Sequence, residues 1–227
     1  MAATLAAVTG FGGAAVLLPV LVAFFGVRDA VPILTIAQLV GNGSRVWLNR
    51  REVALPVVGW FALGGVPLAL AGGWLFATAN ISALTRGLGF FLLLVVLVRR
   101  TGVWKPGRLP LRSFALLGAG SSFLSALVGS VGPLMAPFFL AYGLVKGAYI
   151  GTEAAATVVM HVAKLAAYGG AALLSLHGVL VGLALGPVMI AGSWTGKRIV
   201  DRLPERVFVL LVEVTMVAAG ALFLIKG

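Results

Sequence analysis

Long apolar runs separated by short polar connections account for most of the chain. The runs cover about residues 2–25, 30–49, 54–78, 83–100, 113–143, 147–170, 178–197 and 206–225. Most of them hold the roughly 20 residues that a helix needs to cross about 30 Å of hydrocarbon. Their apolar residues are continuous and do not alternate with period 2, as the strands of a membrane barrel would. The pattern therefore predicts an all-α integral membrane protein.

The chain also repeats itself. Each half opens with an apolar run broken by glycine and proline, first at Gly10-Phe11-Gly12-Gly13 and then at Gly129-Ser130-Val131-Gly132-Pro133. Further on, four residues recur 120 positions later: Pro67, Gly72, Trp74 and Arg86 match Pro187, Gly192, Trp194 and Arg206. We expect two membrane repeats, 1–100 and 113–227, joined by a cytoplasmic basic linker over 101–112. Duplicated, broken membrane segments are typical of secondary transporters, which bind substrate near the bilayer midplane.

The basic residues predict how the runs cross the membrane. If all eight runs cross, Lys146 and the cluster 197–206 lie opposite the basic residues at 45–51 and 99–112, which violates the positive-inside rule. If the two broken runs are instead re-entrant hairpins, thirteen basic residues share the inner side, and Arg28, Arg86 and Lys226 lie outside. The second topology is favoured. It gives each repeat one broken helical hairpin and three transmembrane helices, and it inverts the two repeats relative to each other.

Composition excludes several classes of protein. Apolar residues make up 61% of the chain and charged residues 10%, so no stretch remains for a separate soluble domain. The net charge of +11 lies in short loops, where cytoplasmic orientation explains it without nucleic acid. The chain has no cysteine, which excludes disulfides and thiolate chemistry. The start of the chain lacks the features of a signal peptide, so Ala2 onward is expected in the mature fold.

The glycine breaks are candidate binding elements. Non-helical backbone inside a membrane leaves amide groups that protein, water or a ligand must satisfy. Glycine lets such backbone turn and approach a ligand, and the amides of the following half-helix favour an anion. The alternative is that these glycines only kink or pack helices. The candidates for contact with an anion are Gly10, Gly12, Gly13, Gly129, Ser130 and Gly132.

Unusual polar residues follow each broken run at helical spacing. One stripe consists of Thr35, Gln38, Asn42 and Arg45, and the other of Glu153, Thr157, His161 and Lys164. If both stripes face inward, they line one cavity, and we predict that Thr35, Gln38, Asn42, Thr157, His161 and Lys164 contact the substrate. The alternatives are snorkelling of Lys164 and Arg45, an interfacial position for Glu153 and an interhelical hydrogen bond for His161.

Three ionisable residues are candidates for proton coupling, namely His161, Glu153 and Glu213. We expect no metal site and no cofactor, because the chain has neither a cysteine and histidine ligand cluster nor a phosphate-binding loop. The motifs H-E-x-x-H and G-x-S-x-G are also missing, and the chain is not expected to be an enzyme. An intramembrane transferase that uses His161 and Glu153 on a lipid is the enzymatic alternative, but it lacks a nucleophile.

Several of these motifs resemble a known family. They are T-G-F-G-G-A with P-V-L at 19–21, Q-L-V-G-N at 38–42, and the repeated P-x4-G-x-W at 67–74 and 187–194. Together they resemble the sulfite exporter TauE/SafE family of bacterial and archaeal membrane permeases, over essentially the whole chain. The resemblance implies a multi-pass inner-membrane protein that moves sulfite, sulfonates and related small anions without ATP. Ala14 and Pro133 depart from the commoner glycine pattern, which leaves the anion open.

Taken together, these observations predict an alternating-access secondary transporter of small sulfur-containing anions, an exporter in the cytoplasmic membrane of a prokaryote. The two hairpin tips would hold the anion between them near the midplane. A passive channel or a permease for another small anion is the alternative. The expected partners are the anion and the lipid bilayer, without nucleic acid, and a homodimer is left open.

Overall fold

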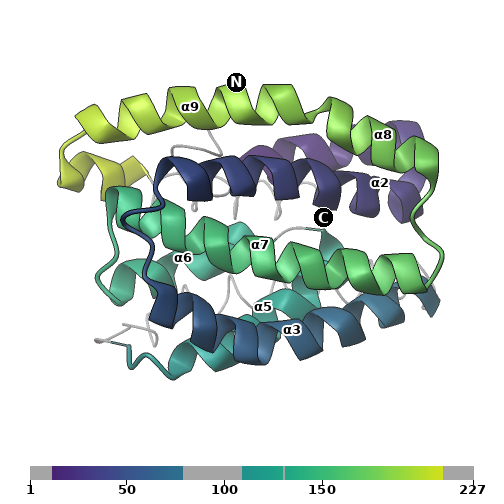
Figure 1. Ribbon diagram of the computed structural model, residues 1–227, viewed down its shortest axis with the longest axis horizontal. Helices are drawn as coiled ribbons and strands as arrows, with labels where there is room; N and C mark the ends of the chain where they lie inside the picture. Colours follow the sequence, from purple (N-terminus) through teal and green to yellow (C-terminus); the bar gives the residue numbers. More distant parts are fainter. Residues whose placement is uncertain (1–11, 79–108, 130, 212–227) are drawn as a thin grey trace.

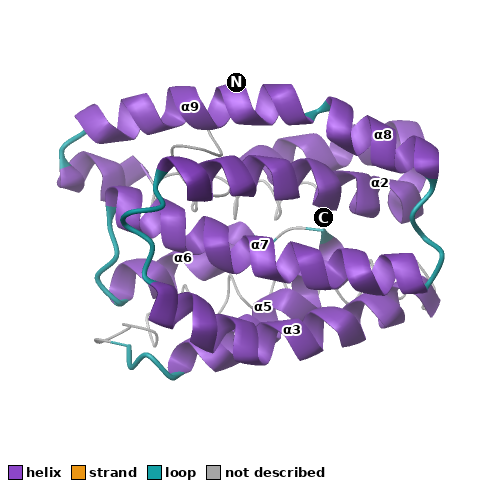
Figure 2. Cartoon of the chain, in the orientation of Figure 1, coloured by secondary structure: helices purple, strands orange, loops and turns teal. Residues whose placement is uncertain are grey.

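The computed structural model of the protein describes residues 12–78, 109–129 and 131–211. Over these residues the chain is helical and contains no strand (Figure 2). The helices are α2 (Gly12–Leu48), α3 (Leu55–Thr78), α5 (Ser113–Val128), α6 (Gly132–Ala141), α7 (Lys146–Gly170), α8 (Leu176–Ala184) and α9 (Gly186–Arg202). They coincide with the predicted apolar runs and confirm the all-α class. The run at 83–100 and most of the run at 206–225 lie outside the described residues.

Helix α2 bends sharply at Gly26, whose φ of 73° and ψ of 166° leave the helical region. A positive φ of this size favours glycine, because it has no Cβ to clash with the backbone. The segment before the bend folds back along the segment after it. Leu21 packs with Ile33 and Leu34, and Leu17 packs with Ala37. The first apolar run and the first polar stripe are therefore neighbours in space.

The second broken run also folds back on itself. Helix α5 ends at Gly129, which has a φ of 88°, and α6 begins at Gly132. At the far end of α6, the rings of Phe139 and Tyr142 lie 5.1 and 5.3 Å from the ring of Phe114 at the start of α5. The run thus returns to the end of the molecule where it started, as the distribution of basic residues predicted.

The helices form layers around α7 (Figure 1). Helix α7 packs between α2 and α3, α5 packs on α3, and α8 and α9 cover α2. Close approach depends on small residues, since Gly64 lies against the backbone of Ala115 and Gly118 against that of Phe61. The third apolar run of each predicted repeat therefore packs on the second apolar run of the other. The inversion of two complete repeats stays a prediction, because the last segment of each lies mostly outside the described residues.

The outer faces of these layers are apolar. Three helical spans are long and apolar enough to cross a membrane: Val20–Leu48, Leu55–Thr78 and Leu176–Arg202. Large apolar side chains point outward from them, for example Phe24, Leu55 and Leu176. Exposed apolar faces of this extent suit contact with lipid tails. Helix α7 has 25 residues but a more polar sequence, and most of its residues are buried among the other helices.

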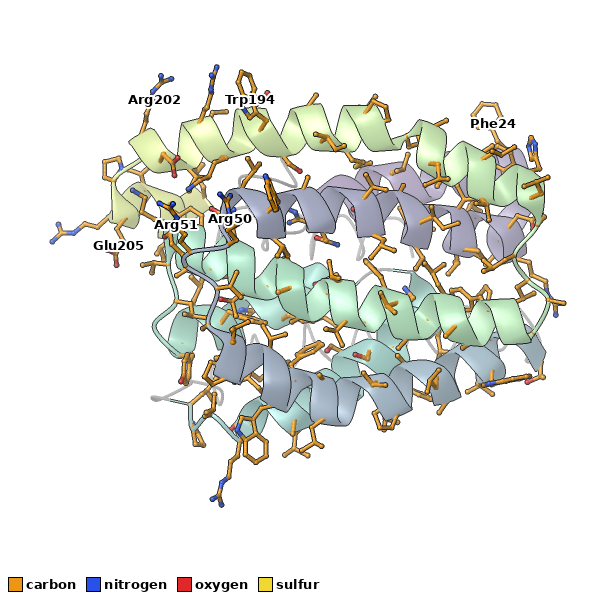
Figure 3. The ribbon with its side chains drawn as sticks, in the orientation of Figure 1. Phe24, Arg50, Arg51, Trp194, Arg202 and Glu205 are labelled. Carbon is orange, nitrogen blue, oxygen red and sulfur yellow. The ribbon has the colours of Figure 1, made fainter. Side chains whose placement is uncertain are left out.

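Basic residues gather at one end of the bundle. Figure 3 shows Arg50, Arg51 and Arg202 at that end and Phe24 at the opposite one. Polar contacts there join the two halves through Lys197 and Glu52 and also connect segments within the second half. Lys197 Nζ lies 3.6 Å from Glu52 Oε1 and 2.7 Å from Asp201 Oδ1, and Lys146 Nζ donates to the backbone oxygen of Asp201 at 3.5 Å. This arrangement agrees with the inner side that the charges predicted.

Candidate functional site

A small pocket lies at the centre of the bundle, where four helices meet. Its cavity of about 20 Å³ has room for roughly one water-sized molecule. The lining residues come from α2, from α5 and the break that follows it, from α6 and from α7. They are Gln38, Asn42, Arg45, Ser125, Gly129, Val131, Gly132, Met135, Glu153, Thr157, Met160 and His161. Both halves of the sequence therefore contribute to one site.

Helical periodicity explains why these side chains share the pocket. Gln38, Asn42 and Arg45 recur every three or four residues and so occupy one face of α2. Thr157 and His161 are spaced in the same way on α7, and Lys164 follows them. Each residue of this second set stands 119 positions after its counterpart in the first. Because α2 packs directly on α7, the two faces meet, and each repeat supplies one cation and two polar groups to the centre.

The floor of the pocket is an ion pair. Arg45 Nη1 lies 3.7 Å from Glu153 Oε2, and both side chains are almost fully buried, with exposures of 5% and 2%. Asn42 Oδ1 accepts a hydrogen bond from Arg45 Nη2, and Thr157 Oγ1 donates to Glu153 Oε1 at 3.2 Å. A buried charge is tolerated only when it is paired and hydrogen-bonded. The polar residues around the pair therefore hold it in place.

Glycine residues and the first amide groups of α6 form another wall of the pocket. Helix α6 starts at Gly132 without a side-chain cap, and Val131 and Gly132 both line the cavity. The first amides of a helix lack partners within the helix and carry partial positive charge. A side chain at Gly129 would need the positive φ of 88° and would lie 3.4 Å from Leu18 and Leu34. The wall is thus made of close-packed backbone that favours negative charge in the pocket.

Lys164 stabilises this wall through hydrogen bonds, although it is not one of the residues that line the cavity. Its side chain is fully buried, and Nζ donates to Ser125 Oγ at 3.1 Å and to the backbone oxygen of Gly129 at 3.3 Å. One turn further on, the hydroxyl of Tyr168 donates to the backbone oxygen of Ala126 at 2.6 Å. The ammonium group therefore takes hydrogen-bond acceptors at the break and adds positive charge beside the pocket. Full burial excludes snorkelling to a membrane surface.

His161 lines the pocket with an unsatisfied nitrogen. Its side chain is 3% exposed, and its Nδ1 has no hydrogen-bond partner among the described residues. Buried polar atoms in folded proteins are nearly always hydrogen-bonded, so this atom is available to a molecule in the cavity. Glu153 Oε2 likewise receives no hydrogen bond from the described part of the chain. It lies 3.7 Å from Nη1 of Arg45, with which it forms an ion pair.

The chemistry of the pocket matches a small anion. Guanidinium, amide and imidazole donors converge with a helix N-terminus, and apolar groups of Met135 and Met160 close the remaining sides. Nowhere in the described ranges do three His, Cys, Asp or Glu residues lie together as a metal site would require. A comparison with protein families adds the identity: the family model described as sulfite exporter TauE/SafE matches residues 1–223. The chain belongs to this family. Searches of curated proteins and of solved structures returned no match.

Membership in the TauE/SafE family makes the chain a membrane permease and identifies the outward apolar faces as lipid-facing. Of the residues predicted to contact substrate in this TauE/SafE protein, the pocket brings together Gln38, Asn42, Gly129, Gly132, Thr157 and His161. Lys164 contacts the break beside the pocket, and the proton-coupling candidate Glu153 lines the cavity. Thr35 lies further along α2, where its hydroxyl donates to the backbone oxygen of Val31 at 2.8 Å.

Other predicted residues fall at the edge of what the structure describes. Gly10, Ser130 and Glu213 lie outside the described residues. Gly12 and Gly13 begin α2, but their surroundings are not described. Conversely, the pocket of this TauE/SafE protein contains residues that sequence reasoning did not place there, chiefly Ser125. Its position four residues before Gly129 puts it on the same face of the chain as the break, which is the one signal that could have found it.

Proposed function

We propose that this chain transports sulfite or a small organosulfonate through the central pocket, as an exporter in the cytoplasmic membrane of a prokaryote. The family supplies the class of protein, a membrane permease named for sulfite export. The pocket itself is the observation that indicates a negatively charged substrate. Two buried cations, Arg45 and Lys164, lie beside a helix N-terminus at the centre of an apolar bundle. Glu153 balances one of these charges by pairing with Arg45, whereas Lys164 donates to neutral acceptors, so the site has an excess positive charge that an anion would balance.

Alternating access is the mechanism that the lining supports. The pocket is lined by α2 of the first half and by α5, α6 and α7 of the second, so motion between the halves would widen it. An oxyanion is larger than one water molecule, and its entry requires α2 and α7 to separate. The ion pair between Lys197 and Glu52 at the basic end joins the same two halves, and it would break when that end opens.

The test is flux in proteoliposomes. Purified protein should move radiolabelled sulfite with saturation, and Gln38→Ala, Asn42→Ala and Lys164→Ala should each lower the flux about tenfold or more, the effect of losing one or two hydrogen bonds to a charged group. Thr195→Ala is the matched control. Thr195 is exposed on α9 and its hydroxyl bonds to Ala191 O within that helix. Flux without saturation would indicate a channel, and unchanged flux in all three variants would exclude this pocket.

A further inference from the structure

The ion pair between Arg45 and Glu153 places a carboxylate where an anionic substrate should bind. Both residues line the cavity, and Glu153 Oε2 lies 3.7 Å from Arg45 Nη1. A substrate anion that approaches the guanidinium must therefore share it with Glu153 or replace it. The buried carboxylate and the substrate carry charges of the same sign and compete for one cation. This arrangement makes Glu153 part of the binding equilibrium as well as part of the pocket wall.

Within the described part of the chain, Arg45 is the cation that pairs with Glu153. From α2 the ionisable neighbour is Arg45, and α7 itself contributes Tyr149, His161 and Lys164. Lys164 donates to Ser125 and Gly129, three turns away along α7. Over their described lengths, α3, α5 and α6 contain no ionisable side chain. On α9, Lys197 pairs with Asp201 and Glu52 at the basic end. A negative charge on Glu153 therefore depends on Arg45.

A carboxylate that loses its cation in such a place takes up a proton. Glu153 is 2% exposed, and a buried, unpaired carboxylate is neutralised rather than left charged. Its hydrogen bond with Thr157 can persist when it is protonated. In the structure the Thr157 hydroxyl donates to Oε1 at 3.2 Å, and a protonated carboxyl group can donate to the same hydroxyl. Both forms of the side chain thus have a partner, which suits a group that changes protonation in each cycle.

We propose that Glu153 is the proton-coupling residue of this transporter: its carboxylate holds Arg45 when the pocket is free of substrate, and it yields Arg45 to the anion by taking up a proton. The anion and the proton then cross together and in the same direction. With a divalent anion, each cycle moves one net negative charge. This inference rests on the proposed function, because it assumes that the anion binds at Arg45.

The first test measures anion affinity against pH in detergent. Wild-type protein should bind sulfite about tenfold more weakly per pH unit as the pH rises, because binding must take up a proton. Glu153→Gln removes the competitor. It should bind sulfite about tenfold or more tightly than wild type at alkaline pH, with that extra pH dependence gone. The ionisation of sulfite itself contributes equally to all proteins, so the difference between variants isolates Glu153.

The matched control is Glu205→Gln, which removes an exposed carboxylate at the basic end (Figure 3) and should behave as wild type. If Glu153→Gln cannot be recovered folded, Glu153→Ala makes the same two predictions. The inference is overturned if the variant binds no more tightly or keeps the pH dependence of wild type. If wild type and control bind no sulfite at any pH, the proposed function has failed instead.

The second test counts protons in proteoliposomes at alkaline pH, where sulfite is the dianion and carries no proton of its own. A trapped pH indicator should report about one proton per anion with wild type and with Glu205→Gln. Glu153→Gln should still exchange labelled sulfite across the membrane, but without proton movement. Proton movement at the wild-type ratio in Glu153→Gln would refute the assignment and leave the transport of sulfite intact.

Discussion

The contact between α3 and α5 allows a prediction about how the pocket is supported. Gly72 on α3 faces α5 so closely that a Cβ there would lie 2.8 Å from the backbone oxygen of Phe123 and 3.0 Å from the Cβ of Ala126. Ordinary contacts between carbon atoms are about 3.5–4.0 Å. Because one of these neighbours is backbone, no rotamer change can relieve the overlap. Gly72→Ala must therefore push the two helices apart by about 0.5–1 Å.

The expected loss of stability follows from that displacement. Inserting a methyl group into a well-packed interior costs about 1–3 kcal/mol. For a chain of this size, 1 kcal/mol corresponds to a shift in Tm of about 2–4 °C, so we expect Gly72→Ala to lower Tm by about 2–10 °C. Sulfite flux should also fall. The C-terminal end of α5 supplies Ser125 to Lys164 and the backbone oxygen of Ala126 to Tyr168, and it leads directly into the break at Gly129.

The assay is thermal unfolding in detergent followed by tryptophan fluorescence, with Gly59→Ala as the matched control. Gly59 lies on the same helix, but nothing lies within 4 Å of a Cβ at that position. Its replacement should leave Tm unchanged or raise it slightly, because alanine favours helix over glycine by up to about 1 kcal/mol. Equal Tm values for the two variants would refute the reasoning, since the close approach of α3 and α5 would then be unnecessary for stability.

Two further predictions concern the site and the topology. Ser125→Ala removes an acceptor from the buried ammonium group of Lys164, so it should destabilise the protein by about 1.5–3 kcal/mol. Ser121→Ala, one turn earlier on α5, removes a buried hydroxyl that bonds to Leu117 O in its own helix, and the loss of this neutral hydrogen bond should cost less, about 1 kcal/mol. Similar unfolding temperatures for the two serine variants would contradict the stabilising role of Lys164. Because the chain has no cysteine, Arg28→Cys and Lys146→Cys can each be labelled alone with a membrane-impermeant thiol reagent, and we expect labelling from opposite sides of the membrane. Labelling of both from one side would exclude the hairpin topology.

The amino-acid sequence was sufficient to predict the helices and the ends of the bundle. Runs of apolar residues give helices because a membrane leaves the backbone no other way to satisfy its hydrogen bonds. The predicted glycine break of the second half interrupts its helix at Gly129, where φ is 88°. The predicted break of the first half lies mostly outside the described residues, and α2 bends at Gly26 instead. The basic residues at 50, 51, 146 and 202 share one end, as their spacing between apolar runs predicted. All of this depends on local pattern, which a single sequence contains.

The local sequence pattern could not predict which groups the polar side chains contact. Periodicity places Arg45 and Glu153 on inward faces, but snorkelling and an interfacial position stayed open for them until the fold paired them. Thr35 belongs to the same stripe as Gln38, yet its hydroxyl bonds to Val31 O in its own helix. Lys164 belongs to the stripe of His161, yet its ammonium group bonds to the break at Gly129. The position of each residue along its helix, relative to the neighbouring helices, decided which hydrogen-bond partner its side chain has.

The sequence by itself determined that this protein is a helical membrane permease with two inward polar stripes and an interrupted run in its second half that folds back on itself. Only the tertiary structure decided which groups meet, namely that α7 lies between α2 and α3 and that a carboxylate from one half holds a guanidinium from the other. The physical reason is the distance along the chain between the residues that interact. Helix formation and amphipathicity are set by neighbours within about four residues. The register between helices is set by close-packed small residues such as Gly64 and Gly118, whose partners are distant in the chain.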